Sequence, residues 1–377
     1  MEGWEGGSMG RQMTVTVRLD TPLLQGGPTC LLGGGGANGW TLATELRESQ
    51  VKGLLHTFAR ALFLPLLDES PQKAKHAERL LLGAPAGTTW KKNDKNQEYG
   101  KVLSIETSGP DSVKTETYPN RPGKADKGSR RGVSPGATYT ITLRLMPWVP
   151  EPETHLKALW AVLWTGLCFG AIGIRSRRGY GGLTPTEIVI QPVATGESCW
   201  KALLFPDPPA SKEALAKELS AGFTTAQSWV QAWVACQKSN KRTPAPRSSP
   251  GEDPFQIAGL SQVFIGEARN GGNAPWEAIM KPLMQASSKE LDRCKKEHSN
   301  DHREIIGSAT NPRLASPVWL RIFKTDSGYV PVITLGSSKT FNGNGVPKPI
   351  VQALLDSVRA MPISEIIPAA GTEGAIP

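Results

Sequence analysis

The stretch at residues 173–183 sets three arginines among glycines, with the sequence GIRSRRGYGGL. Glycine reaches positive φ values at little cost and lets a bulky group approach the backbone closely. Arginine presents a planar, permanently charged fork of donors that matches the oxygens of a phosphate. This combination predicts a loop that holds a polyanion. The alternative is an ordinary glycine-rich turn whose arginines are solvated.

Both side chains and backbone of this stretch could contact phosphates. The N–H groups of Gly179 and Gly181 could donate hydrogen bonds to phosphate oxygens, because glycine leaves the backbone accessible. The predicted contacts within the stretch are Gly173, Arg175, Ser176, Arg177, Arg178, Gly179 and Gly181.

A second set of cations lies on a helix predicted from about Ser49 to Leu67, with Ser49 as its N-cap. Lys52, His56 and Arg60 recur at every fourth position, so they share one face, roughly opposite the apolar stripe. This face is a second candidate for binding an anionic ligand. An ordinary solvated helix face explains the same pattern.

The composition favours a basic, loop-rich globular protein. The 377 residues carry a formal net charge of +9, which favours nucleic acid or an anionic membrane surface as partner. The five cysteines are widely spread and form no Cys-x-x-Cys pair, so we expect neither a zinc site nor a disulfide framework. A reducing, cytoplasmic location is the simplest expectation, and residues 1–12 do not look like a signal peptide.

The segment 158–174 is uncharged and is followed by the three arginines, which imitates a membrane span with a positive flank. Seventeen residues are at the lower limit for crossing a bilayer, and Trp160 and Trp164 lie in mid-segment rather than at an interface. We therefore expect a buried helix of a soluble protein, from about 154 to 170, and no membrane partner.

The first half of the chain shows an order of elements that is typical of a ferredoxin-like domain. Alternating residues predict strands, and apolar residues at helical spacing predict helices between them. The order is strand, helix, strand or hairpin, helix, loop and strand, which fits a split βαβ unit. The predicted elements are strands at 13–19, 138–145 and 186–193, a strand or hairpin at 102–107, and helices at 49–67 and 154–170.

The second half repeats the theme with weaker signals. Its strands 318–324 and 329–335 are joined through Asp326-Ser327-Gly328, which predicts a hairpin. Helices are predicted at 210–238, 275–296 and 350–361. The expected fold class is therefore α+β, with two tandem ferredoxin-like, or RRM-like, domains and long loop insertions.

The expected domains follow from these elements and from composition. A flexible N-terminus at 1–12 precedes a first domain at 13–195 and a second at 196–365, and a tail follows at 366–377. The first domain contains a basic insertion at 90–134, whose segment 91–131 could act as an arm that orders on RNA. The second contains a flexible basic loop at 238–254.

Four segments resemble the RAMP superfamily of CRISPR proteins. The runs 17–27 (VRLDTPLLQGG) and 45–60 (ELRESQVKGLLHTFAR) are similar to the family's opening and to its Ser-x-x-Lys-Gly-x-x-Arg pattern, and 173–183 looks like its glycine-rich loop. The run 311–318 (NPRLASPV) resembles an Arg-x-Ala-Ser-Pro segment of one branch. That branch is the first-numbered RAMP subunit of the Cmr, or type III-B, effector complex.

The resemblance implies a non-catalytic subunit that binds CRISPR RNA and holds the 3′ part of the guide. Implied partners are the guide RNA, the target RNA and other RAMP subunits of a Cmr complex, and no cofactor or metal is implied. It adds Arg47, Lys52, His56 and Arg60 to the expected RNA contacts. His56 departs from the family, which commonly has arginine there.

Three alternatives stay open. His56 could be the general base of a metal-independent nuclease that processes CRISPR RNA, although such enzymes usually carry the glycine-rich loop close to the C-terminus. The chain could be a structural assembly subunit without RNA contact, or a membrane-anchored protein. Asp20 resembles the metal-binding loop aspartate of backbone subunits, but a turn or fold role is favoured. His298 and His302 are expected in a solvated loop rather than at a metal.

Overall fold

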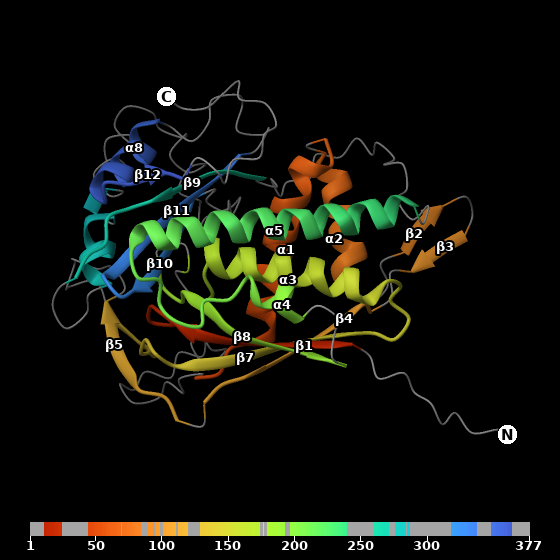
Figure 1. Ribbon diagram of the computed structural model, residues 1–377, viewed down its shortest axis with the longest axis horizontal. Coiled ribbons are helices and arrows are strands. Elements are labelled where there is room, and N and C mark those ends of the chain that lie inside the picture. Colours follow the sequence, from red (N-terminus) through yellow and green to blue (C-terminus); the bar gives the residue numbers. More distant parts are fainter. Residues whose placement is uncertain are drawn as a thin grey trace, which may run out of the picture.

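The structure is a computed structural model, and Figure 1 shows its arrangement of helices and strands. It describes residues 11–24, 44–68, 70–83, 89–92, 95–98, 101–110, 112–119, 129–173, 176, 179–192, 197–239, 259–270, 276–283, 285–286, 318–337 and 348–363. The helices are α1 (Glu48–Leu66), α2 (Pro71–Leu82), α3 (Pro152–Phe169), α4 (Glu197–Lys201), α5 (Lys212–Ser239) and α8 (Lys348–Ser357).

The described strands fall into two four-stranded sheets and two hairpins. The first sheet contains β1 (Gln12–Leu19), β4 (Leu103–Ser108), β7 (Thr138–Leu145) and β8 (Leu183–Gln191). The second contains β9 (Gly259–Ile265), β10 (Val318–Thr325), β11 (Gly328–Ser337) and β12 (Met361–Pro362). The hairpins are β2 (Thr89–Lys92) with β3 (Lys95–Glu98), and β5 (Thr115–Pro119) with β6 (Ser129–Val133).

The first sheet has the order β4-β7-β1-β8, and β1 pairs antiparallel with both β7 and β8. Together with α1 and α3 this is the βαββαβ arrangement, so the expected ferredoxin-like topology is confirmed. Along β1 every second side chain is buried, because successive side chains of a strand point to opposite faces. The buried side chains Met13, Val15 and Val17 form the floor of the core.

Among the described residues, the helices lie on one face of this sheet (Figure 1). All side chains from Ala158 to Phe169 of α3 are buried, which explains the uncharged segment that imitated a membrane span. The long helix α5 packs against α3 on the side away from the sheet. Within the described part of the chain, we find no helix that is both long enough and apolar enough to cross a membrane.

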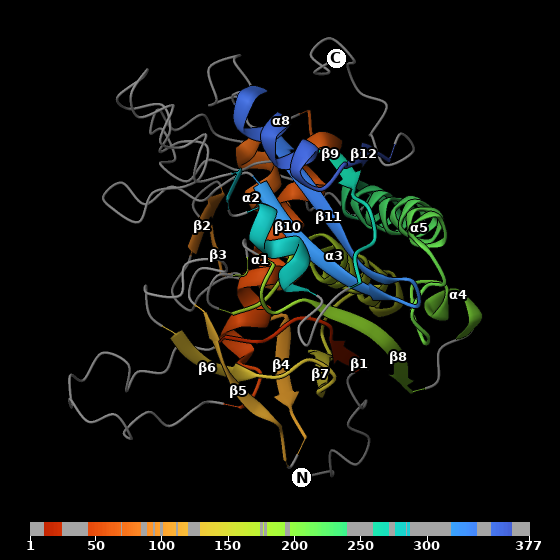
Figure 2. The ribbon, with the colours of Figure 1, turned by 90° about the vertical axis from the view of Figure 1, so that its left-hand side faces the viewer.

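The second sheet has the order β10-β11-β9-β12, with a helical segment at 277–283 after β9 and α8 before β12. This repeats the strand order of the first unit, so the expected tandem of ferredoxin-like folds is confirmed. Its strands contact α1 and α3, and Figure 2 shows the second sheet on the side of these helices away from the first. The two units therefore share one helical layer.

Several details differ from the sequence expectations. Helix α1 begins at Glu48 with Arg47 as its N-cap, so the expected N-cap Ser49 is wrong. The N–H of Arg47 donates instead to Oε1 of Gln50 at 3.3 Å. The strand or hairpin expected at 102–107, within the basic insertion 90–134, is the strand β4, which pairs with β7 at the edge of the first sheet. The loop 238–254 lies almost entirely outside the described residues, as do His298 and His302.

A buried histidine joins three helices of the first unit. Nε2 of His155, in α3, lies 2.8 Å from the carbonyl oxygen of Leu81 in α2, and Nε1 of Trp233 in α5 donates to Nδ1 at 3.3 Å. Only the neutral ring with its proton on Nε2 satisfies both partners. Burial disfavours the charged imidazolium and lowers the pKa of His155 to about 4, although the hydrogen bond to Leu81 acts in the opposite direction.

This histidine predicts a loss of stability in mild acid. Between its ordinary value near 6.5 and its folded value of about 4, the unfolded chain binds the extra proton, so the free energy of unfolding falls as the pH falls. The loss should reach roughly 2–4 kcal/mol by pH 4, at about 1.4 kcal/mol per pKa unit. Urea unfolding between pH 7.5 and 4 measures it, with His155→Gln as the comparison. The two proteins losing stability in parallel would contradict this account.

A glycine lets α5 approach α3 closely. A Cβ at Gly222 would lie 2.4 Å from Cζ2 of Trp164, a fully buried ring. Gly53, in α1, is exposed and has open space around its Cβ position.

The two positions predict opposite effects of the same substitution. Gly53→Ala should raise the free energy of unfolding by about 0.5–1 kcal/mol, because alanine favours a helix. Gly222→Ala should lower it by about 1–3 kcal/mol, because the new methyl group overpacks the interface between α3 and α5. The urea midpoints of the two variants measure these changes. An increase in both midpoints would show that α3 and α5 accommodate the new methyl group without loss of stability.

Candidate nucleic-acid interface

The glycine-rich loop connects the end of α3 to the start of β8, between the two ferredoxin-like units. Its described residues are 171–173, 176 and 179–182. Gly173, Gly179 and Gly181 all have positive φ, so the expected use of glycine for special backbone conformations is confirmed. At Gly181 the need is steric as well, because a Cβ there would lie 1.8 Å from the carbonyl oxygen of Ile172.

Backbone hydrogen bonds close this loop on itself and on the end of β1. The N–H of Ile172 donates to the carbonyl of Gly181 at 2.9 Å, and the N–H of Gly181 donates to Pro22 at 2.9 Å. The N–H of Gly179 donates to Ser176 at 3.2 Å. The amides of Gly179 and Gly181, which we expected to face phosphates, therefore already have partners within the protein.

An aromatic side chain anchors the loop in a core that both units build. Tyr180 is fully buried, and its ring centroid lies 5.7 Å from that of Trp276, which precedes the helical segment 277–283. Tyr118, from the β5–β6 hairpin, packs against the same tryptophan at 5.7 Å. The loop is therefore held between a hairpin of the first unit and a helical segment of the second.

The three arginines of the loop, Arg175, Arg177 and Arg178, lie outside the described residues. Ser176, between them, is half-buried. The structure thus describes the framework that carries the arginines, and their contact with phosphate stays a prediction.

The three cations of α1 lie in different environments. Lys52 is exposed, whereas His56 and Arg60 are about one-third exposed and turn toward Glu78 in α2. Nη2 of Arg60 donates to Oε1 of Glu78 at 2.9 Å, and both Nε of Arg60 and Nδ1 of His56 also contact this carboxylate. Two members of the expected basic face therefore bind an acid of the protein.

Glu78 is buried, and its charge has a structural explanation. Burial alone would raise the pKa of this carboxyl group, but hydrogen bonds and the charges of His56 and Arg60 bring it below its usual value. Sequence reasoning missed Glu78. The signal was an acid on the apolar face of α2, beside the buried Ala74, Ala77 and Leu81, since a buried charge needs a partner.

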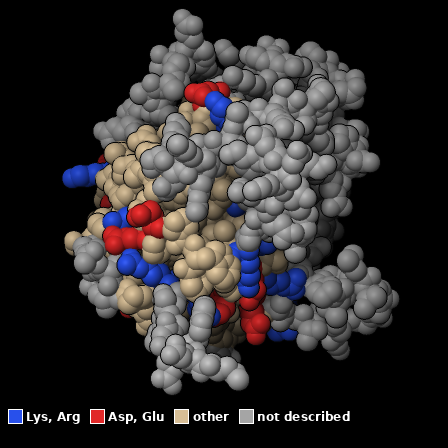
Figure 3. Space-filling view, turned by 90° about the vertical axis from the view of Figure 1, so that its right-hand side faces the viewer, with Lys and Arg blue, Asp and Glu red and all other residues tan. Residues whose placement is uncertain are grey.

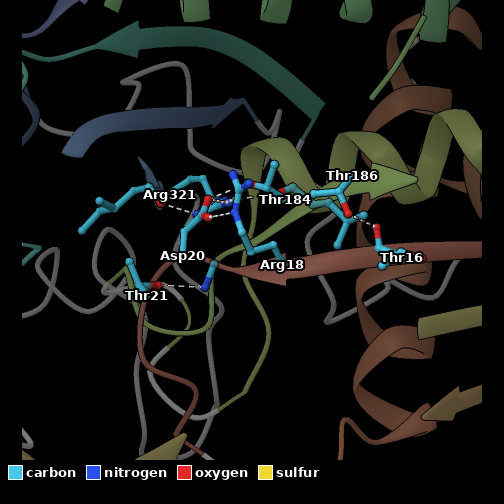
Figure 4. A network of polar contacts seen from close by, with 10 residues as sticks. Thr16, Arg18, Asp20, Thr21, Thr184, Thr186 and Arg321 are labelled. Atoms are coloured by element: carbon cyan, nitrogen blue, oxygen red, sulfur yellow. Dashed lines mark hydrogen bonds and ion pairs between the residues drawn. The ribbon is translucent and has the colours of Figure 1, made fainter. Parts of the chain in front are cut away.

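Asp20 has the fold role that the sequence favoured. It is buried, and its Oδ2 accepts from Nη2 of Arg321 at 2.8 Å and from the hydroxyl of Thr184. Arg18 donates to its other oxygen at 3.3 Å. Figure 4 shows this network between the two units. Among the described residues, no group of three or more His, Cys, Asp or Glu could hold a metal ion.

Sequence reasoning also missed Arg321. It stands in the otherwise apolar run Val-Trp-Leu-Arg-Ile-Phe at 318–323, and it is 0% exposed. A charged residue inside an apolar strand signals a buried partner, but the run itself does not reveal which one.

The outer face of the first sheet offers hydroxyl groups rather than aromatic rings. Thr14 of β1 and Thr142 of β7 are hydrogen-bonded across it at 3.0 Å, and Thr140 contacts Ser108 of β4. RRM domains stack bases on aromatic side chains of this face. Since the described outward residues of β1, β4, β7 and β8 include no aromatic side chain, this face is a poor candidate for base stacking.

Charge does not mark the end of the sheet where β1 begins. Figure 3 shows that side of the molecule, where Lys and Arg alternate with Asp and Glu in small groups. Two described cations at this end are in ion pairs, Arg144 with Glu106 at 3.0 Å and Lys157 with Glu153 at 3.0 Å. The glycine-rich loop, at the opposite end of β1, remains the better candidate for a polyanion.

Comparison with known proteins agrees with this fold. Residues 21–184 match the family model of the RAMP superfamily, from the residue after Asp20 to the start of β8. No curated protein matches the sequence. The structure of Cmr1 from Pyrococcus furiosus, in its apo form, is similar, with a TM-score of 0.56 and 16% identity over 93% of this chain and 98% of that chain.

Two cryo-EM structures of the type III-B Cmr-beta complex bound to cognate target RNA contain similar chains. Their TM-scores are both 0.56, at 10% and 11% identity. The matches cover 93% and 95% of this chain, and 99% and 100% of those chains. Residues 21–184 therefore resemble the RAMP superfamily, and over nearly its whole length the chain has the fold of Cmr1.

Proposed function

We propose that this protein is a non-catalytic, RNA-binding subunit of a type III-B, or Cmr, effector complex. It holds the 3′ part of a CRISPR guide RNA, contributes to binding of the target RNA, and contacts other RAMP subunits. The observation that carries the proposal is the likeness to Cmr1 and Cmr-beta chains across both ferredoxin-like units, rather than across one common domain alone.

The glycine-rich loop supports RNA contact through its rigidity. Its described residues are tied by backbone hydrogen bonds, and Tyr180 anchors them, so these residues lose little conformational entropy when the loop binds RNA. Arg175, Arg177 and Arg178 lie between these residues in the sequence, and in this proposal they supply the positive charge. Lys52 is an exposed cation of α1 and supplements them.

His56 and Arg60 are weaker contributors in this proposal. Glu78 already accepts from both, so its negative charge offsets one positive charge of the pair. Any contribution to RNA binding comes from the atoms that Glu78 leaves unoccupied, namely Nε2 of His56 and Nη1 of Arg60. Arg47, at the N-cap of α1, is half-buried and remains a proposed contact.

The loop arginines make the central prediction. The triple variant Arg175→Ala, Arg177→Ala and Arg178→Ala should bind single-stranded RNA roughly 10- to 100-fold more weakly, because each phosphate contact releases counterions. The slope of log affinity against log salt should fall in magnitude by roughly 0.7 for each lost contact. Fluorescence anisotropy with labelled RNA over a salt series measures both.

A charge-matched variant controls for net charge. Arg144→Ala, Lys201→Ala and Lys217→Ala remove three exposed cations from β7, α4 and α5. This protein should retain most of its RNA affinity. Equal losses in the two triple variants would contradict a localised site, and unchanged affinity in the loop variant would favour a structural subunit without RNA contact.

The pairing of His56 with Glu78 is the one observation that favours a nuclease, because a carboxylate can orient a histidine for proton transfer. This carboxylate also binds Arg60 and joins α1 to α2, which fits a structural role equally well. We expect no cleavage when the protein is incubated with CRISPR-repeat RNA in EDTA, as checked by gel electrophoresis. Product that disappears with His56→Ala would establish the processing nuclease instead.

A further inference from the structure

One buried guanidinium of the second unit contacts both ends of the glycine-rich loop of the first. Arg321 extends from β10, where Nε donates to the carbonyl oxygen of Leu167 at 3.0 Å. Its Nη2 donates to Oγ1 of Thr184 and to Oδ2 of Asp20, each at 2.8 Å. Figure 4 shows Arg321 meeting Asp20 and Thr184 at the end of β1.

These partners stand at the points where the loop begins and ends. Leu167 is in the last turn of α3, just before the loop, and Thr184 is the second residue of β8, just after it. Asp20 follows β1, and its N–H donates to the carbonyl of Gly182 at 2.9 Å. The guanidinium of Arg321 thus fixes the distance between the two ends of the loop.

The second unit also forms the wall against which the loop lies. A Cβ at Gly182 would lie 2.0 Å from Nη1 of Arg321, so only glycine leaves room for the guanidinium. A Cβ at Gly179 would lie 3.0 Å from Cδ1 of Ile322, the next residue of β10. The loop therefore depends on β10 for its position as well as on its own hydrogen bonds.

We propose that Arg321 is a positioning residue for RNA binding: β10 holds the glycine-rich loop in its binding geometry through this side chain. This inference rests on the proposed function of the loop. Arg321 is 0% exposed, so it acts without touching RNA. In this proposal the second ferredoxin-like unit holds the RNA site of the first unit in position.

The ion pair must be removed as a pair to test this. Loss of one partner leaves an uncompensated buried charge and strongly destabilises a protein, whereas replacing both partners with neutral groups is often tolerated. The double variant Asp20→Asn and Arg321→Met keeps a polar partner for Thr184 and fills the space of the guanidinium stem. It removes the bond to Leu167 and the tie between the loop's two ends.

The full-length double variant should bind labelled single-stranded RNA about tenfold more weakly, because the loop must now be ordered on binding. Its salt slope should equal that of the wild type, because all phosphate contacts are still made. Hydrogen exchange of residues 171–183 should be faster than in the wild type. A variant with wild-type affinity, or with a reduced salt slope, would overturn the positioning role.

Arg269 supplies a matched control. It is a partly buried arginine that donates to two carbonyl groups, those of Ala278 at 3.0 Å and Ser357 at 2.8 Å, entirely within the second unit. Arg269→Met should leave RNA affinity unchanged. A loss equal to that of the double variant would show that general destabilisation explains the effect, and would overturn the inference.

The two proposals fail in different ways. If the triple arginine variant of the loop binds RNA as the wild type does, the proposed function fails. If that variant is impaired while the Asp20→Asn, Arg321→Met protein binds normally, the loop binds RNA but Arg321 does not position it.

Discussion

A fully buried ion pair between Asp20 and Arg321 joins the two ferredoxin-like units, and the arrangement around it depends on its being satisfied. Two charges taken out of water cost several kcal/mol each, and only good geometry with further hydrogen bonds offsets that cost. Here Thr184 donates to the carboxylate, and the carbonyl of Leu167 accepts from the guanidinium. Because the pair needs these partners, the end of α3, the start of β8 and strand β10 must meet at one place.

The glycines of the glycine-rich loop are explained by close contacts within the protein, around this ion pair, without any ligand. The backbone of Gly181 lies close to the carbonyl oxygen of Ile172, and Gly182 leaves room for the guanidinium of Arg321. A motif of glycines and arginines invites the interpretation that both residue types face a phosphate. In this fold the amides of Gly179 and Gly181 donate hydrogen bonds within the protein, so the amide contacts with phosphate that the motif suggests are not needed to explain these two glycines.

The basic face of α1 shows that the spacing of charges along one helix does not reveal which of them are paired. Its regular spacing places Lys52, His56 and Arg60 on one side of the helix, yet α2 packs against that side and brings Glu78 to it. The RRM-like topology invites a similar inference, that RNA lies on the open sheet. The threonines on the described part of that face lack the rings for stacking, so the shared topology does not carry the shared binding mode.

The sequence by itself determined what depends on near neighbours in the chain. Alternation predicted β1 and β7 almost to the residue, and helical spacing predicted α1, α3 and α5. The repeated order of elements also sufficed to predict two ferredoxin-like units.

Only the tertiary structure decided which buried charges meet. Asp20 and Arg321 are 301 positions apart, and nothing in either local pattern names the other. The same holds for His56 and Glu78, which two separate helices bring together, and for the packing of α5 on α3 rather than on the second sheet. Periodicity is a property of a short segment, whereas the partner of a buried polar group is a property of the packed whole.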